Sequence, residues 1–256
     1  LTAYNNRLYG WTNMGGAYNQ GVLFEYNPAV NSYTKKIELG HSDGHSPAGA
    51  LVYYNGKIYG TTWNGGNNNR GVIYAYDPVT RQYSILFHMS DATGFQSDQG
   101  GFLLHNHMLY GVAALGGNNG SGVLFRFDPQ NNQYTVLHHF SAATGNMPRA
   151  LPIVYNNKLY GVTSQGGSNN GGVLYEYDLI TNSYSAKVNF GGSFGRLPYA
   201  SLIEYNGKLY GVTRGGGNHE GGTLFEFTPG INGFAVHHHF SLAEGSDPET
   251  ALVLYN

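Results

Sequence analysis

Histidines are the first residues in this 256-residue chain whose type and spacing could do chemistry, because imidazole is a common metal ligand and cysteine is absent. Six of the eleven gather at one register of a repeat: His88, His138–His139 and His237–His238–His239. On a strand, His237 and His239 share a face while His238 points away. We expect the three groups to lie on separate outer strands, so they cannot converge, and we predict no metal site.

Carboxylates are the second set. Those expected on one rim of the molecule are Asp43, Asp91, Asp98, Glu220, Glu244, Asp247 and Glu249. A pair of carboxylates can cleave a glycosidic bond, but the pair should project from the innermost strands, which carry no acid except Glu204. Ca²⁺ could bind among these acids, although no ligand spacing specifies it. We therefore predict no catalytic residue and no cofactor, and keep a glycan-cleaving enzyme as an alternative.

A third set suits recognition of a sugar, whose C–H groups stack on aromatic rings and whose hydroxyls bond to planar polar groups. The candidate ligand-binding residues are Trp11, Tyr18, His45, Trp63, Arg70, Phe95, Asp98, Arg149, Arg196, Tyr199, His219 and Asp247. For the two tryptophans, burial between repeat units is the competing interpretation.

These residues are positioned by a repeat of about fifty residues. A tyrosine in a Leu/Ile-Tyr-Gly triplet recurs at intervals of 50, 51, 50 and 50, at Tyr9, Tyr59, Tyr110, Tyr160 and Tyr210. Such regularity indicates one supersecondary unit stacked on copies of itself. We divide the chain into units 1–50, 51–101, 102–151, 152–201 and 202–251, with an extra first strand at 252–256.

Each unit is expected to contain four short antiparallel strands. In residues 152–201 they are 153–155, 158–163, 172–177 and 183–190, separated by turn signals such as Asn156-Asn157. No helical periodicity is present. The pattern predicts an all-β chain that forms one domain, 1–256, a β-propeller of about five four-stranded blades. A window cut from a longer repeat array is the alternative.

The antiparallel order sorts the loops onto two rims. The turns after the first and third strands are tight, as at Asn55-Gly56 and Asp77-Pro78. The loops after the second strand and the connections between blades are long, as at 65–70 and 90–101. Function concentrates on long loops held by a rigid frame, so we place the candidate binding face on this long-loop rim.

The repeated motifs resemble a known family. Tyr-x-Gly-Lys-Leu-Tyr-Gly-Val-Thr, a Gly-Gly pair, Gly-Val-Leu-Phe-Glu-Tyr-Asp-Pro and Gly-x-x-Pro recur in fixed order. They resemble the GloVer-type tandem repeat of bacterial surface proteins and, more distantly, kelch. The likeness to kelch departs at the strand-four tryptophan, replaced here by Tyr33, Tyr83, Tyr134, Tyr184 or Phe234. The GloVer resemblance implies export and surface attachment, and it transfers no catalytic motif.

Charge and hydropathy narrow the partners. A net charge of −2 with only 13 Lys and Arg argues against nucleic acid and anionic membranes, and no apolar run is long enough to cross a bilayer. The chain begins at Leu1, and we expect it to be a piece of something longer. We predict an extracellular, non-catalytic, lectin-like module whose partner is a glycan. A structural or adhesive protein that docks a surface protein is the alternative.

Overall fold

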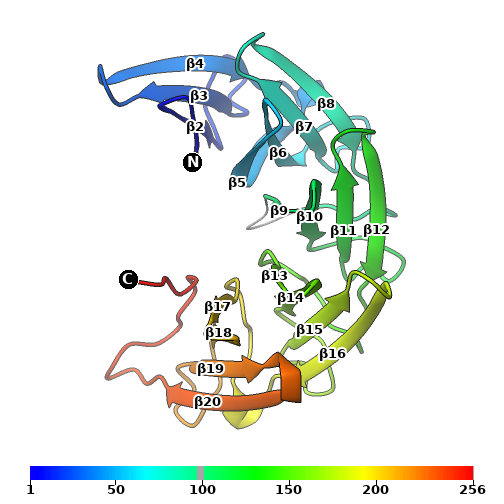
Figure 1. Ribbon diagram of the computed structural model, residues 1–256, viewed down its shortest axis with the longest axis vertical. Helices are drawn as coiled ribbons and strands as arrows, with labels where there is room; N and C mark the ends of the chain where they lie inside the picture. The colour runs from blue at the N-terminus through cyan, green and yellow to red at the C-terminus, as the bar shows by residue number, and fades with distance from the viewer. Residues whose placement is uncertain (97–100, 256) are drawn as a thin grey trace.

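The computed structural model describes residues 1–96 and 101–255. Within those residues twenty strands form five four-stranded antiparallel sheets, each made of four consecutive strands. We call these sheets blades 1 to 5 in chain order. They follow one another around an open arc that covers more than half of a circle, and both termini lie on its open side (Figure 1). The predicted all-β propeller of about five four-stranded blades is confirmed.

The first strand of a blade is innermost and the fourth is outermost (Figure 1). Blade 1 contains β1 (Thr2–Tyr4), β2 (Arg7–Thr12), β3 (Val22–Asn27) and β4 (Ser32–Glu38). Blade 2 contains β5 (His45–Tyr54), β6 (Lys57–Asn64), β7 (Val72–Asp77) and β8 (Gln82–His88). Blade 3 contains β9 (Leu103–His105), β10 (Met108–Ala113), β11 (Val123–Asp128) and β12 (Gln133–His139).

The last two blades repeat this layout. Blade 4 contains β13 (Ile153–Tyr155), β14 (Lys158–Thr163), β15 (Val173–Asp178) and β16 (Ser183–Asn189). Blade 5 contains β17 (Ile203–Tyr205), β18 (Lys208–Thr213), β19 (Thr223–Thr228) and β20 (Gly233–His239). Three 3₁₀ turns complete the described elements: η1 (His41–Asp43), η2 (Gly192–Phe194) and η3 (Pro229–Ile231). The four strands expected in residues 152–201 therefore form within one residue of their predicted bounds.

Local turn chemistry closes the hairpins on the tight rim. Asn55 and Gly56 have φ values of 46° and 83°, the left-handed pair that a two-residue hairpin requires. At the other turn, the Asp77 carboxylate accepts backbone N–H groups from Thr80 at 3.0 Å and Val79 at 2.8 Å. The Thr80 bond is the main reason that the pKa of Asp77 lies below its usual value. These turns set the strand register on which the long-loop rim rests.

A glycine recurs inside the second strand of each blade. Close approach by the neighbouring blade is one explanation for the missing side chain at such a position. Instead, the ring above it belongs to the same sheet: Gly111 pairs with Phe125, and a Cβ on Gly111 would lie 2.5 Å from Phe125 Cζ. The missing side chain leaves room for this aromatic ring.

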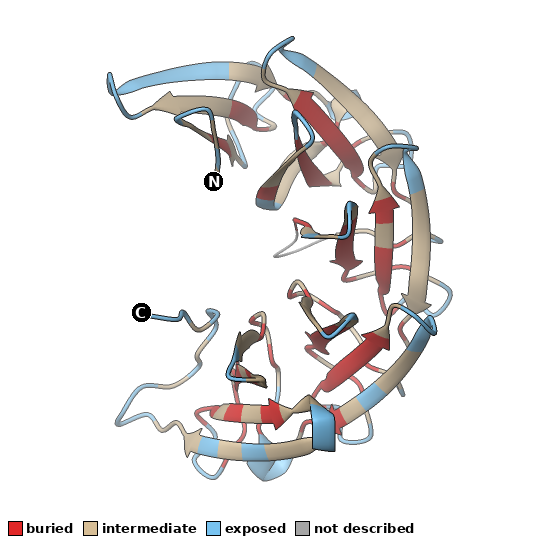
Figure 2. Cartoon of the chain, in the orientation of Figure 1, coloured by how far each residue is buried: buried red, intermediate tan, exposed pale blue. Residues whose placement is uncertain are grey.

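The core lies between blades. Figure 2 shows the buried segments concentrated in the second and third strands. Among the described residues, four clusters of buried side chains each join two consecutive blades. Tyr74 and Tyr76 of blade 2, for example, pack against Tyr9 and Leu23 of blade 1. Aromatic side chains of the third strands thus fill the space between consecutive blades.

Two segments differ from the repeat. Strand β5 is ten residues long because His45, Pro47 and Ala48 pair with β6 before the usual first strand begins. The expected extra first strand at 252–256 is not formed over 252–255, because these residues adopt no strand. Asn256 is outside the described residues. No helix in the described part of the chain is both long and apolar enough to cross a membrane.

Candidate functional site

Two positions on the long-loop rim carry a different residue type in each repeat unit. One is the fourth residue after each repeat tyrosine: Asn13, Trp63, Ala114, Ser164 and Arg214. The other is the residue after the connecting proline: Ala48, Arg149, Tyr199 and Glu249. Two cavities on this rim are lined in part by these positions. The strands that carry these positions thus repeat from blade to blade, whereas the residue types that line the cavities differ.

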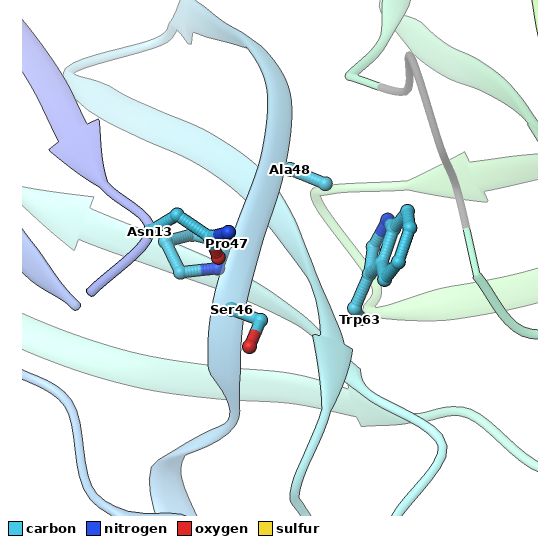
Figure 3. Close-up of a pocket in the computed structure, with 5 residues that line it drawn as sticks. All are labelled: Asn13, Ser46, Pro47, Ala48 and Trp63. Atoms are coloured by element: carbon cyan, nitrogen blue, oxygen red, sulfur yellow. The ribbon is translucent and has the colours of Figure 1, made fainter. Parts of the chain in front are cut away.

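The first cavity, the Trp63 pocket, lies between blades 1 and 2. It has a volume of about 220 Å³ and is lined by Asn13, Ser46, Pro47, Ala48 and Trp63. Figure 3 shows the three β5 residues along one strand, with Asn13 and the Trp63 indole extending from neighbouring segments. The indole Nε1 is buried and has no hydrogen-bond partner within the described chain. The part of the ring that reaches the cavity is therefore aromatic carbon.

The wall of this pocket is held by a backbone anchor that recurs. Ser46 adopts a left-handed φ of 55°, and its N–H donates to the carbonyl oxygen of Gln20 at 3.3 Å. The same conformation and bond are found at Met147, Leu197 and Asp247. The anchor ties each inter-blade connection to the preceding blade. Asp247, a predicted ligand residue, is exposed and its backbone makes this anchor.

The second cavity, the Tyr199 pocket, has a volume of about 260 Å³ and is lined by Arg149, Tyr199, Arg214 and Glu249. The guanidinium carbons of Arg149 and Arg214 lie 5.7 and 5.9 Å from the centre of the Tyr199 ring. Arg214 also pairs with Glu249 at 3.2 Å. The pocket therefore has two guanidinium groups against one carboxylate, a polar lining quite unlike that of the Trp63 pocket.

Other predicted residues form local pairs outside both pockets. Arg70 pairs with Asp91 at 2.8 Å, and its guanidinium carbon lies 4.3 Å from the centre of the Phe95 ring. Arg196 pairs with Glu220 at 3.1 Å. All four charged side chains are substantially exposed, so these pairs contribute little to stability, and they link neighbouring loops.

The remaining predicted residues are dispersed. Trp11 packs edge-on against Tyr74 at 5.2 Å in the interface of blades 1 and 2, and this position agrees with burial rather than ligand contact. Tyr18 and His219 are exposed on loops. His45 lies beside His41, and burial, followed by this neighbour, holds its pKa below the ordinary value. Asp98 lies outside the described residues. The predicted set thus separates into two pockets and several isolated positions.

Four of the rim carboxylates each lie beside a basic side chain. Asp91, Glu220 and Glu249 each pair with an arginine, and Glu244 lies 3.6 Å from His238 Nε2. In these four contacts the acid faces an arginine or a histidine instead of a second carboxylate. No cluster of three or more histidines and acids suited to a metal ion occurs in the part of the chain that the structure describes.

One buried acid was missed by the sequence reasoning. Glu176, 7% exposed, accepts hydrogen bonds from Tyr160 Oη at 2.6 Å and Lys158 Nζ at 2.8 Å, and Lys187 lies 3.3 Å away. Burial opposes its charge, but these donors and cations outweigh burial and hold the pKa of Glu176 below its usual value. The network fixes the repeat tyrosine, and equivalent Tyr–Glu bonds occur at Glu25 and Glu226.

The pocket residues Asn13, Ser46, Ala48 and Arg214 were also absent from the predicted set. Aligning the units on their tyrosine and proline shows that the residue types at these positions differ from unit to unit. Other columns of the same loops also vary, as at Ser46, Met147, Leu197 and Asp247, so variation alone does not single out the pocket residues.

Comparison with known proteins identifies the repeat. The Gloeobacter/Verrucomicrobia repeat family matches residues 1–99 and residues 69–256. The chain belongs to this family. The match confirms the GloVer resemblance, and it extends over all five blades. No curated protein matches the chain.

Solved structures similar to this GloVer chain share its fold at low identity. A chain of a nidogen/laminin complex is 11% identical with a TM-score of 0.57, over 96% of this chain and 80% of that one. TolB from Acinetobacter baumannii is 17% identical with a TM-score of 0.51, over 94% and 54%. The extracellular domain of a protein described as a one-component system from B. thetaiotaomicron is 14% identical with a TM-score of 0.57, over 93% and 30%. The GloVer chain thus spans about half of TolB and less than a third of the last protein.

Proposed function

We propose that this GloVer chain is a non-catalytic recognition module that binds a neutral carbohydrate in the Trp63 pocket. The observation that supports the proposal most is the lining of that pocket. It combines the carbon surface of an indole ring with the Asn13 amide and the Ser46 hydroxyl, and none of the described residues that line it is charged. An apolar platform with a few polar groups that fix orientation is the general design of a small-ligand site.

The size of the cavity limits the ligand. Pockets for drug-sized molecules are about 300–1,000 Å³, and the Trp63 pocket at about 220 Å³ is smaller. It therefore suits one sugar ring of a longer chain, with the adjoining rings in solvent. A site of this size with few polar groups gives an affinity in the millimolar to micromolar range. We further propose an extracellular location, which the low charge and the GloVer resemblance support.

Trp63→Ala tests the proposal. The substitution removes the stacking surface, and we expect at least about a tenfold loss of affinity, or about 1.4 kcal/mol, for the glycan that binds the native chain. The measurement is a glycan array followed by titration calorimetry on the best ligand. Tyr18→Ala is the matched control, since Tyr18 is an aromatic residue of the same rim that is 66% exposed and lines neither pocket.

Protein docking is the second candidate, and the exposed residues Met14 and Tyr18 favour it. Both are 66% exposed on the loop between β2 and β3, and both residue types are enriched in protein interfaces. A ligand whose binding is lost in Tyr18→Ala and kept in Trp63→Ala would support this candidate. A broad array without a single glycan hit would contradict the carbohydrate proposal.

A further inference from the structure

The two ends of the arc expose side chains that the interfaces within the arc bury. We call the side of a blade that faces the preceding blade its front, and the opposite side its rear. On the front, the strand-three aromatics of blades 2 to 5 are 0% exposed: Tyr74, Phe125, Tyr175 and Phe225. The equivalent Phe24 on the front of blade 1 is partly exposed, and its neighbour Tyr33 is 56% exposed.

The rear of blade 5 shows the matching half. The residue after strand four inserts between blades and is at most 1% exposed in blades 1 to 4, at Leu39, Met89, Phe140 and Phe190. Its equivalent in blade 5, Phe240, is partly exposed, as is Leu224, whose counterparts in the other blades are fully buried. Nearby Leu242 is 90% exposed. Blade 5 therefore presents the inserting half of the interface, and blade 1 presents the receiving half.

Two specific contacts show how such an interface closes. Phe87 stacks on Tyr134 of the next blade at 4.3 Å and 1°, and His138 stacks on Tyr184 at 3.8 Å and 6°. The tyrosine hydroxyl then donates to a carbonyl oxygen of the preceding connection, as Tyr134 Oη does to Thr93 at 2.6 Å. Tyr83 and Tyr184 make the same bond to Asp43 and Thr144.

The partners for these contacts are separated at the ends of the arc. His238 holds the stacking position of His138 on the rear of blade 5, where its side chain is 43% exposed. The Glu244 carbonyl holds the position of the Thr144 carbonyl. Tyr33 holds the position of Tyr184 on the front of blade 1. Donor, acceptor and stacking surfaces are all present, and they are divided between two blades at opposite ends of the arc (Figure 1).

We propose that each end of the arc docks a further blade with the same repeat signature. Such a blade would bring a strand-three and a strand-four aromatic to Phe240 and His238, or an inserting apolar residue to Phe24 and Tyr33. The chain already forms this interface between each pair of its consecutive blades, and a further blade would continue the series. A second whole copy does not suit the surface, because two arcs that each exceed half a circle would overlap (Figure 1).

Lys35 on the front of blade 1 departs from the residue type that the other blades carry at its register. The other blades have Ile85, Val136, Ala186 and Val236 at its register. Ala186 stays exposed although its interface is formed, so this position lies at the margin of the contact. Lys35 pairs with Glu38, and its aliphatic stem can cover the margin while the ammonium group stays in water.

The test adds one blade at a time to the full chain. In one variant a copy of residues 157–201 follows Asn256, so that 252–256 provide the first strand. In the other a copy of residues 152–201 precedes Leu1. Because the chain has no cysteine, His238→Cys and Tyr33→Cys each give a single reporter thiol. We expect the added blade to slow thiol labelling about tenfold or more at the end that it covers, because it would cover the thiol as the inner interfaces partly cover the equivalent side chains.

Control variants test whether the protection comes from the proposed interface. Lysines at the positions of Tyr175 and Tyr184 in the C-terminal copy, or of Phe190 in the N-terminal copy, should abolish protection. Val79→Cys, on an exposed turn, should label at one rate throughout. Unchanged labelling at His238→Cys and Tyr33→Cys would overturn the proposal, whether or not the added blade folds. Protection of the unextended chain that rises with its concentration would identify a second copy as the occupant and would also overturn it.

Discussion

At the scale of single residues, glycine and aromatic side chains act as pairs. Gly111 is buried under the ring of Phe125, its cross-strand partner, and the ring occupies the space that a Cβ would need. The same arrangement places Tyr175 over Gly161. The sequence spacing shows the glycine and the aromatic residue, but it does not show that they are neighbours in one sheet. From spacing alone, the glycine could equally be covered by a side chain of the neighbouring blade. Cross-strand register decides between these explanations.

Gly111→Ala should therefore destabilise the fold by about 1–3 kcal/mol, the usual cost of an added methyl group in a packed core. The new Cβ would lie 2.5 Å from Phe125 Cζ and 3.0 Å from both ring Cε atoms. Urea unfolding gives the free energy of each variant. Gly230→Ala is the control, because a Cβ there meets nothing within 4 Å. Equal stability of the two variants would contradict the explanation.

At the scale of elements, the outer strand of one blade stacks on that of the next. His138 of β12 lies flat on Tyr184 of β16 at 3.8 Å and edge-on to Phe140 at 5.0 Å. Burial, followed by the nearby His139, lowers the pKa of His138 to about 4. The sequence analysis placed this histidine on an outer strand. The structure makes it a neutral contact between two blades.

This stack predicts a pH dependence of stability. The folded-state pKa of about 4 lies below the ordinary histidine value of about 6.5. Folding therefore favours the neutral ring, so the contribution is complete above pH 6.5 and is lost as the pH falls from 6.5 towards 4. His138→Phe keeps the stack without the titration and should lose less stability than the native chain over this interval. Urea midpoints at pH 7, 5.5 and 4.5 measure the difference, and parallel pH curves would contradict it.

At the scale of the whole molecule, stability is shared between neighbouring blades. Blades 2, 3 and 4 are covered on both sides, whereas blades 1 and 5 are each covered on one (Figure 2). Arrays of this kind behave as a sum of unit and nearest-neighbour terms. The end blades should consequently open locally before the middle one does.

Hydrogen exchange should show this gradient. We expect backbone amides of β3 in blade 1 and β19 in blade 5 to exchange about tenfold or more faster than those of β11 in blade 3, because local opening is easier where one face lacks a neighbour. The three strands occupy the same place in their blades, so they serve as matched comparisons. Uniform protection across all three would indicate a single cooperative unit.

Local sequence patterns were enough to specify a single blade. Tyrosine and glycine spacing, the Asn-Gly and Asp-Pro turns and the alternating aromatics act over a few residues, and they specify four strands, their register and the position of the long loops. Arg149 and Tyr199 were identified on the correct rim for the same reason. Which rim residues meet depends on the tertiary structure. Trp63 shares a cavity with Ser46 of its own blade and with Asn13 of the preceding one, Trp11 is packed between blades, and Arg70 and Arg196 pair locally. These outcomes depend on how consecutive blades are rotated about the arc, and that rotation is set by long-range packing that no local pattern encodes.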